Sequence, residues 1–296
     1  MSKAVVKQKR PMTAARFKRV FMNSLVHVIL GLLAAIWLFP IFWVVMTSLR
    51  KESGAYTSYF FPKALTFDNY IRLFTETTQL NFPRMFLNTL FISIIVCIIS
   101  TTFVLCVSYC MSRLRFKMRK PFMNIAMIMG LFPAFMSMVA VYFILKALGL
   151  IEGNMVYISL ILIYSAGSGA GFYIAKGFFD TVPKSLTEAA VLDGCNQFQV
   201  FYKIILPLSK PIVVYTILTS FLGPWLDFIF CKVIVGPRDK YWTVSIGLYN
   251  MLEKEFVNGW FTRWAAAAVI VSIPIAILFI IMQRFYVDGL TGAVKG

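Results

Sequence analysis

Six long stretches of this 296-residue sequence contain no charged side chain, or only one. A helix needs about 20 residues to cross roughly 30 Å of hydrocarbon, and every stretch reaches that length. Because lipid offers the backbone no hydrogen-bond partners, long segments without alternation favour helices over barrel strands. We therefore predict an all-α integral membrane protein with six transmembrane helices. The stretches are Val20–Leu49, Met85–Ser112, Pro121–Leu145, Gly153–Ala175, Pro211–Cys231 and Trp264–Gln283.

The composition excludes an ordinary soluble domain. Hydrophobic residues make up 59% of the chain and charged residues 14%, with a mean hydropathy of +0.78, which lies far outside the range of globular proteins. The formal net charge of +17 would suggest a nucleic-acid partner for a soluble chain. Beside membrane spans, however, basic residues fix the topology and lie against anionic lipid head groups, and no segment resembles a nucleic-acid-reading module. We expect membrane lipids as partners and no nucleic acid.

Basic residues also indicate which side of the membrane each loop occupies. Two segments, 1–19 and 113–120, carry clusters of Lys and Arg and no acid. Such clusters belong on the cytoplasmic side. With six spans, both termini and the loop 176–210 are then cytoplasmic. The chain is predicted to divide into a basic N-terminal segment (1–24), a six-helix transmembrane domain (25–283, containing the loop 176–210) and a C-terminal tail (284–296).

The loop 176–210 contains the most specific motif of the sequence. Ser185 and Glu188 are spaced as a capping box, which predicts that a helix begins there. Gly194 can adopt the left-handed conformation that ends such a helix after about two turns, and a second helical run is expected from Gln197 to Leu206. Because the alanine side chains are small, the first helix can pack closely into a groove of another protein. The residues that define the motif are Ser185, Glu188, Ala189, Ala190, Asp193, Gly194, Ile204, Leu206 and Pro207.

This spacing resembles the cytoplasmic coupling loop of the membrane subunits of bacterial ATP-driven importers. It is similar in particular to the carbohydrate-uptake branch, the maltose-type G-subunit family, in which Pro, Glu-Ala-Ala, Asp-Gly and Leu-Pro-Leu-x-x-Pro follow in this order. The resemblance extends over the whole length and implies the fold of a type I ABC importer permease. It also implies that the motif residues couple the chain to an ATPase. The matching residues are Pro183, Glu188–Ala190, Asp193–Gly194, Leu206–Leu208 and Pro211.

The end of the chain carries a second point of resemblance. The ending Asp288–Gly296 is similar to the tail of the G-subunit family, which reaches into the ATPase dimer. The resemblance implies that this tail contacts the ATPase as well. The expected contact residues are Gly289, Leu290 and Thr291.

The resemblance further implies a multi-subunit importer for a sugar or an oligosaccharide, such as a maltodextrin, in a bacterial inner or plasma membrane. The expected partners are an ATPase homodimer, a second, non-identical permease and an extracellular solute-binding protein. No Gly-Lys dipeptide occurs in the sequence, so the chain has no P-loop of its own. We therefore expect no metal or cofactor on this chain, ATP and Mg²⁺ on the partner ATPase, and no enzymatic activity of the permease itself.

Two other regions are candidates for contact with substrate or partner. Asp227 is the one acid inside a predicted span, where an unpaired carboxylate is costly. With Trp225, it either lines the translocation path or, near the outer end of its span, reaches water or caps a helix broken at Gly223–Pro224. Aromatic residues of the loop 232–263 either stack on sugar rings or anchor at the membrane interface, and the resemblance implies that this loop enters the cleft of the binding protein. The aromatic candidates are Tyr241, Trp242 and Tyr249.

A stand-alone secondary transporter or channel is the alternative function. It would require an inverted repeat and functional polar residues at mid-membrane, and the sequence shows neither clearly. An intramembrane enzyme is disfavoured because the chain has one His and almost no acids within its predicted spans. The motif of the loop 176–210 therefore favours the importer.

Overall fold

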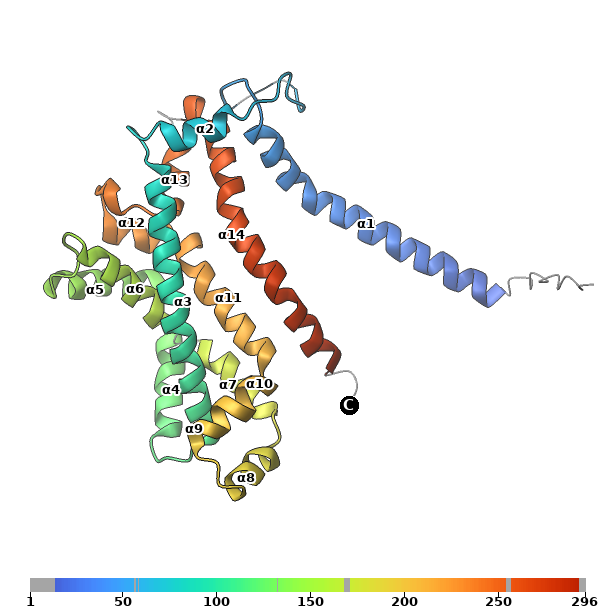
Figure 1. The fold of residues 1–296 in the computed structure, drawn as a ribbon, viewed down its shortest axis with the longest axis vertical. Helices are drawn as coiled ribbons and strands as arrows, with labels where there is room; N and C mark the ends of the chain where they lie inside the picture. Colours follow the sequence, from blue (N-terminus) through green and yellow to red (C-terminus); the bar gives the residue numbers. More distant parts are fainter. Residues whose placement is uncertain are drawn as a thin grey trace, which may run out of the picture.

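The structure is a computed structural model in which helices account for most of the described chain (Figure 1). It describes residues 14–55, 57, 59–131, 133–167, 171–253 and 257–292, and for residues 14–20, 134–135, 167 and 286–292 it describes the backbone alone. In chain order the helices are α1 (Ala14–Ser48), α2 (Asp68–Thr75), α3 (Phe82–Arg113), α4 (Arg119–Gly130), α5 (Ala134–Ala147), α6 (Met155–Gly167), α7 (Gly171–Thr181), α8 (Lys184–Leu192), α9 (Gln197–Val200), the π-helix η2 (Phe201–Ile205), α10 (Leu206–Leu208), α11 (Lys210–Leu226), α12 (Ile229–Val235), the 3₁₀-helix η3 (Asp239–Tyr241), α13 (Val244–Met251) and α14 (Val257–Gly292).

Three of the described helices, α1, α3 and α14, are long and apolar enough to cross a membrane by themselves. Two more spans result if each of two bent pairs counts as one: α6 with α7, bent by 41°, and the α9–α10 run with α11, bent by 88°. The predictions of an all-helical membrane protein and of long helices at the first, second and sixth stretches are confirmed. The count of six spans and the cytoplasmic location of the termini stay predictions.

The third predicted stretch, 121–145, is not one helix. It is divided between α4 and α5, and Pro133 stands directly before α5 with φ −57° and ψ 128°. Proline has no N–H to donate and disfavours helical dihedrals in the residue before it. A single continuous helix over this stretch is therefore the wrong interpretation, although each half is apolar.

The fifth stretch, 211–231, is also interrupted. α11 ends at Leu226, the N–H of Asp227 donates to Gly223 O at 3.1 Å, and α12 begins at Ile229. The end follows Pro224, which cannot donate a backbone hydrogen bond. The break therefore places Asp227 between two helices instead of within one.

α3 is the central helix of the bundle, and α6, α7 and α11 pack against it (Figure 1). One end of α3 meets α2 and α13, where Leu73, Phe82 and Met251 are almost fully buried. We call this the α2 end. The opposite end meets α7 and the segment from α8 to α10, where Phe179 and Ile205 have no exposed surface. We call this the α8 end, and it positions the motif described below.

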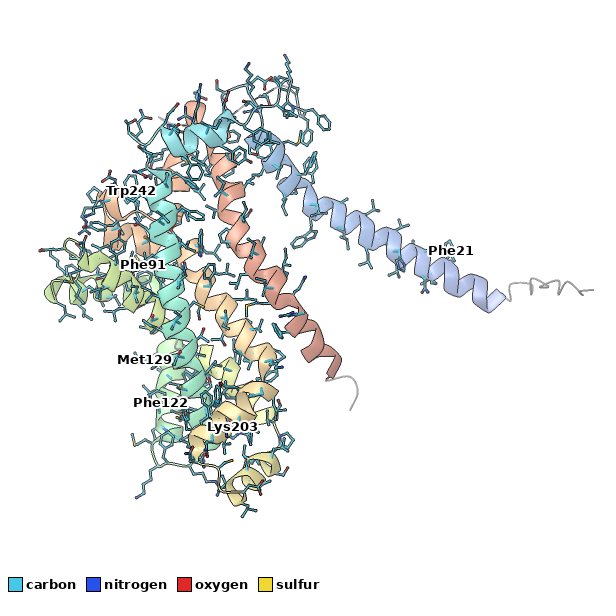
Figure 2. All side chains as sticks on the ribbon, viewed as in Figure 1. Phe21, Phe91, Phe122, Met129, Lys203 and Trp242 are labelled. Atoms are coloured by element: carbon cyan, nitrogen blue, oxygen red, sulfur yellow. The ribbon has the colours of Figure 1, made fainter. Side chains whose placement is uncertain are left out.

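α1 leaves the bundle and contacts it only through its last turns. The side chains from Phe21 to Phe42 are exposed, and the first ring contact with α14 joins Trp43 to Phe261 at 6.0 Å between centroids. Figure 1 shows α1 diverging from α14, and Figure 2 shows Phe21 with no helix beside it. A helix that is apolar all round is one that lies in lipid or against another protein.

Candidate functional site

The motif predicted in the loop 176–210 folds into two short helical runs at the α8 end (Figure 1). The first run is α8, which begins at Lys184 directly after Pro183, and no side chain caps its N-terminus. The predicted capping box of Ser185 and Glu188 is therefore wrong. Pro183, with φ −55° and ψ 131°, occupies the cap position, and its fixed φ starts the helix two residues earlier than a cap at Ser185 would.

The end of α8 is as predicted. Gly194 has φ +88°, in the left-handed region that residues with a Cβ rarely adopt. Its N–H donates to Val191 O at 3.0 Å, and the next N–H, of Cys195, donates to Ala190 O at 2.9 Å. These bonds satisfy the last carbonyls of the helix in the manner of a Schellman motif. Gly194 thus ends α8 and turns the chain into the second run.

The residues of α8 divide between a buried side and an exposed side. Ala190 is 7% exposed and belongs to the apolar cluster at the α8 end, whereas Glu188, Ala189 and Asp193 are exposed. Leu192 is 88% exposed. A helix with one alanine against its own bundle and the other facing outward is suited to close contact with a second surface.

The second run carries the motif back to the bundle. Asn196 and Gln199 form a capping box, each side chain accepting the other's backbone N–H at 2.9 Å. The run then widens into η2, in which the N–H of Leu206 reaches back five residues to Phe201 O. Pro207 explains the widening, because it lacks an N–H and its ring would clash with the carbonyl four residues earlier in a regular helix.

The predicted helical run from Gln197 to Leu206 is confirmed, and it continues to Leu208. Ile204 and Leu206 are half-buried against the cluster at the α8 end, whereas Pro207 is exposed. Phe198 and Tyr202 are also exposed, at 73% and 64%. Together with Leu192 of α8 they give this end of the molecule an apolar outer surface. Phe198 and Tyr202 lie on the same helical run as Lys203, which Figure 2 labels.

Two side chains at the end of α3 hold the motif in place. The hydroxyl of Tyr109 donates to Gln197 at its side-chain oxygen, 2.8 Å, or its backbone oxygen, 3.0 Å. The guanidinium of Arg113 donates to Phe179 O and, at 2.7 Å, to Val182 O just before α8. The sequence predicted Arg113 only as part of a topology-determining cluster. No local signal could have assigned either contact, because the partners are more than 60 residues away in sequence.

Asp227 combines two of the roles that the sequence left open. Its carboxylate accepts the N–H groups of Phe230 and Cys231, at 3.3 and 3.1 Å, and so caps α12 rather than the helix before the break. It also accepts the hydroxyl of Tyr164 at 2.8 Å. The same carboxylate lines a cavity of about 560 Å³ between α3, α6, α7 and α11.

Trp225 lies away from this cavity. It is 4% exposed and packs between Phe86 and Phe221, with ring centroids 5.5 and 5.8 Å away. The structure therefore separates the two residues that the sequence grouped as a translocation path. Asp227 faces the cavity, and Trp225 belongs to the core of the α2 end.

Replacing Asp227 with alanine is expected to lower the free energy of unfolding by about 1 to 2 kcal/mol, the usual contribution of an N-cap side chain. Asp227→Asn keeps one oxygen, which can still accept one of the two N–H groups, and should lose less. Thermal unfolding of the purified chain in detergent, followed by tryptophan fluorescence, measures both. Asp239→Ala, which removes an exposed acid in η3, is the control. Equal losses for the alanine and asparagine variants would contradict the capping role.

The aromatic residues of the loop 232–263 differ in exposure. Tyr241 is 7% exposed, and its hydroxyl donates to Asn154 Oδ1 at 3.0 Å. Trp242, labelled in Figure 2, is half-buried beside α3, where Asn88 donates to its carbonyl at 3.0 Å. Tyr249 is 50% exposed. Of the three, Tyr249 has the most exposed side chain, and one face of its ring stacks on Phe228 at 4.4 Å between centroids.

The expected tail contacts Gly289, Leu290 and Thr291 lie in the last turns of α14, where the backbone alone is described. The N-terminal residues 1–13 and the final residues 293–296 lie outside the described residues, as do Lys254 and Glu255 of the loop 232–263. The predictions that fall on these residues stay predictions.

Comparison with known proteins places this geometry among transport proteins. The family model described as "Binding-protein-dependent transport system inner membrane component" matches residues 104–291. The chain is 32% identical over 272 residues to the galactooligosaccharides transport system permease protein GanQ of Bacillus subtilis (strain 168), covering 91% of this chain and 94% of that protein. It is also 32% identical over 282 residues to the maltodextrin transport system permease protein MalD of Streptococcus pneumoniae (strain ATCC BAA-255 / R6), covering 95% of this chain and 98% of that protein.

A solved structure has a similar fold. The chain superposes, with a TM-score of 0.74 and 22% identity, on a chain of a bacterial ABC transporter involved in the import of the acidic polysaccharide alginate. The match covers 94% of this chain and all of the other. At this identity the likeness concerns the fold, which agrees with the predicted permease architecture.

Proposed function

The chain belongs to the family of binding-protein-dependent transport system inner membrane components, and from this we propose that it is the sugar- or oligosaccharide-importing permease subunit whose α8 couples an ATPase to transport. The membership makes it an ABC transporter permease of the bacterial inner membrane, in a carbohydrate-transport branch. A stand-alone transporter or channel is not favoured by these relatives. Permeases of this family are generally non-catalytic, which accords with an ATPase on a separate chain.

The observation that carries the coupling role is the exposed side of α8. A short helix ended by Gly194 presents Glu188 and Ala189 to the outside while Ala190 anchors it to the bundle. The apolar side chains beside it, led by Leu192, form the kind of surface that a partner protein covers. We assign ATPase docking to this surface. ATP and Mg²⁺ would bind the ATPase, and closure of that dimer would move α8.

The topology of the proposal follows from the same surface. α8 must face the cytoplasm to meet an ATPase, so the α8 end is the cytoplasmic end and the α2 end faces outward. The basic loop between α3 and α4 then lies inside, in agreement with the positive-inside rule. We further propose six spans, with α4 and α5 together as the third, and both termini inside. A second, non-identical permease and an extracellular solute-binding protein complete the importer, with the loop 232–263 facing the binding protein.

Co-purification tests the coupling role. A tagged chain isolated from its own membrane should carry an ATPase, identified by mass spectrometry through its P-loop peptides. Glu188→Ala should reduce the retained ATPase by about tenfold, the effect of losing an interface residue worth about 1.4 kcal/mol. Glu152→Ala removes an exposed carboxylate before α6 and should retain the ATPase fully.

Uptake tests the substrate class. Cells that lack this chain should lose ATP-dependent accumulation of at least one labelled oligosaccharide from a panel, and the wild-type chain should restore it. Undiminished uptake of the whole panel without the chain would sink the sugar assignment. ATPase retention would still report on the coupling role, so the two parts of the proposal fail separately.

A further inference from the structure

A basic cavity of about 450 Å³ lies between α8, the end of α3 and the loop that leads to α4. Four cations line it, and Glu188 is the one carboxylate among its lining residues. None of these five side chains makes an ion pair with another described residue. The residues that line the cavity therefore carry an excess of positive charge. The four cations are Arg113, Arg115, Arg119 and Lys184.

Arg113 adds a second, independent observation that points to an anion. One of its terminal nitrogens is engaged by the carbonyls of Phe179 and Val182. Its Nε is buried and has no acceptor among the described residues. A buried donor without an acceptor is costly, most of all on a charged group. An anion in the cavity would place acceptor oxygens beside this guanidinium.

The lining fits a phosphate group better than a carboxylate. Three guanidinium groups provide planar forks that bind phosphate through paired hydrogen bonds, and Lys184 adds a point charge. Ser112 and Thr187 also line the cavity, but their hydroxyls already donate to Asp180 Oδ1 and to Lys184 O, at 2.6 and 2.7 Å, so the four cations supply the donors. Its volume lies within the usual range for small-ligand sites. We propose that this cavity binds a phosphate group, carried either by an anionic phospholipid head group or by a soluble phosphate.

The site would connect α8 to the loop between α3 and α4. Arg115 and Arg119 belong to the loop and the start of α4, whereas Lys184 and Glu188 belong to α8. A phosphate held between them ties α8 to the loop and restricts its movement. Basic pockets beside membrane-spanning helices are known sites for lipid head groups, which makes membrane composition a way to control α8.

The test compares two double variants with the same loss of charge in the same segment. Arg115→Gln with Arg119→Gln removes cations that line the cavity. Lys117→Gln with Lys120→Gln removes exposed neighbours that do not line it. The full chain is placed in nanodiscs of neutral phosphatidylcholine, with or without phosphatidylglycerol. Native mass spectrometry counts the phosphatidylglycerol molecules that remain bound. In a separate experiment, the unfolding temperature in the neutral nanodiscs is measured at increasing concentrations of inorganic phosphate.

The arginine double variant should lose roughly thirtyfold in affinity, from about 1 kcal/mol for each cation near the anion, and the lysine double variant should retain wild-type binding. Glu188→Gln should bind more tightly, because it removes the repelling carboxylate. Binding of phosphatidylglycerol alone identifies a head group as the ligand, and stabilisation by inorganic phosphate identifies a soluble one. Either result supports the site.

Equal weakening in the two double variants would overturn the proposal, since it would mean that general charge and not the cavity attracts the anion. Absence of both lipid retention and phosphate stabilisation would overturn it as well. No ATPase takes part in these measurements, so a failure of the docking role assigned to α8 leaves the result unchanged.

Discussion

Gly194→Val is expected to abolish ATP-dependent uptake while the protein still inserts in the membrane. Valine at φ +88° brings its Cβ into conflict with the adjoining carbonyl, which costs about 1 to 2 kcal/mol even for unbranched residues and more for a branched one. The strain is relieved if α8 does not end where it does, and the second run then loses its direction. Because α8 is the proposed contact with the ATPase, retention of the ATPase should fall with uptake.

The matched control for this substitution is Gly149→Val. Gly149 has φ +70°, is exposed, and like Gly194 has nothing within 4 Å of an added Cβ. It lies in the turn after α5, far along the chain from α8. The two variants should lose similar stability in thermal unfolding, and uptake should persist in the control. If both variants stopped uptake equally, general strain and not the end of α8 would be the cause.

Substitution with leucine is expected to lower the stability of the protein at one alanine of the motif and to leave it nearly unchanged at the other. Ala190→Leu places three extra carbon atoms in a packed cluster and should lower the free energy of unfolding by about 1 to 3 kcal/mol. Ala189→Leu, on the exposed side, should change it by less than about 0.5 kcal/mol. Thermal unfolding of the purified chain measures both.

ATPase retention then separates the two positions. Ala189→Leu should lose the ATPase although the chain stays stable. The larger side chain would prevent close contact between α8 and the surface of the ATPase. Ala147→Leu, an exposed alanine at the end of α5, is the control and should keep the ATPase. Full retention by Ala189→Leu would exclude a close contact on this side of α8.

The features that the sequence predicted correctly are those with a local cause. The absence of charge marks α1, α3 and α14, since lipid tolerates charge poorly and the length of a span is fixed by the bilayer. The left-handed glycine at 194 is likewise a local necessity of a helix end. The predicted capping box does not form because Pro183, two residues before Ser185, is the stronger start signal and begins the helix first.

What the sequence could not supply depends on contacts between distant segments. Tyr109 meets Gln197 across 88 residues, and nothing near either residue predicts the meeting. Trp225 and Asp227 are two residues apart, yet the break after Leu226 sends one into the core and the other to a cavity. The basic cavity is of the same kind, since its cations come from α3, the following loop, α4 and α8.

α3 gives the molecule a single stiff member that reaches from one end to the other. Its 32 residues extend over about 48 Å. At one end of α3, Tyr109 and Arg113 form hydrogen bonds with the motif. Near the other end, Asn88 donates to the carbonyls of Lys240 and Trp242. A rigid rod that tilts about its middle carries its ends in opposite directions at the same instant. A displacement of α8 that tilts α3 would therefore move the α2 end at the same time.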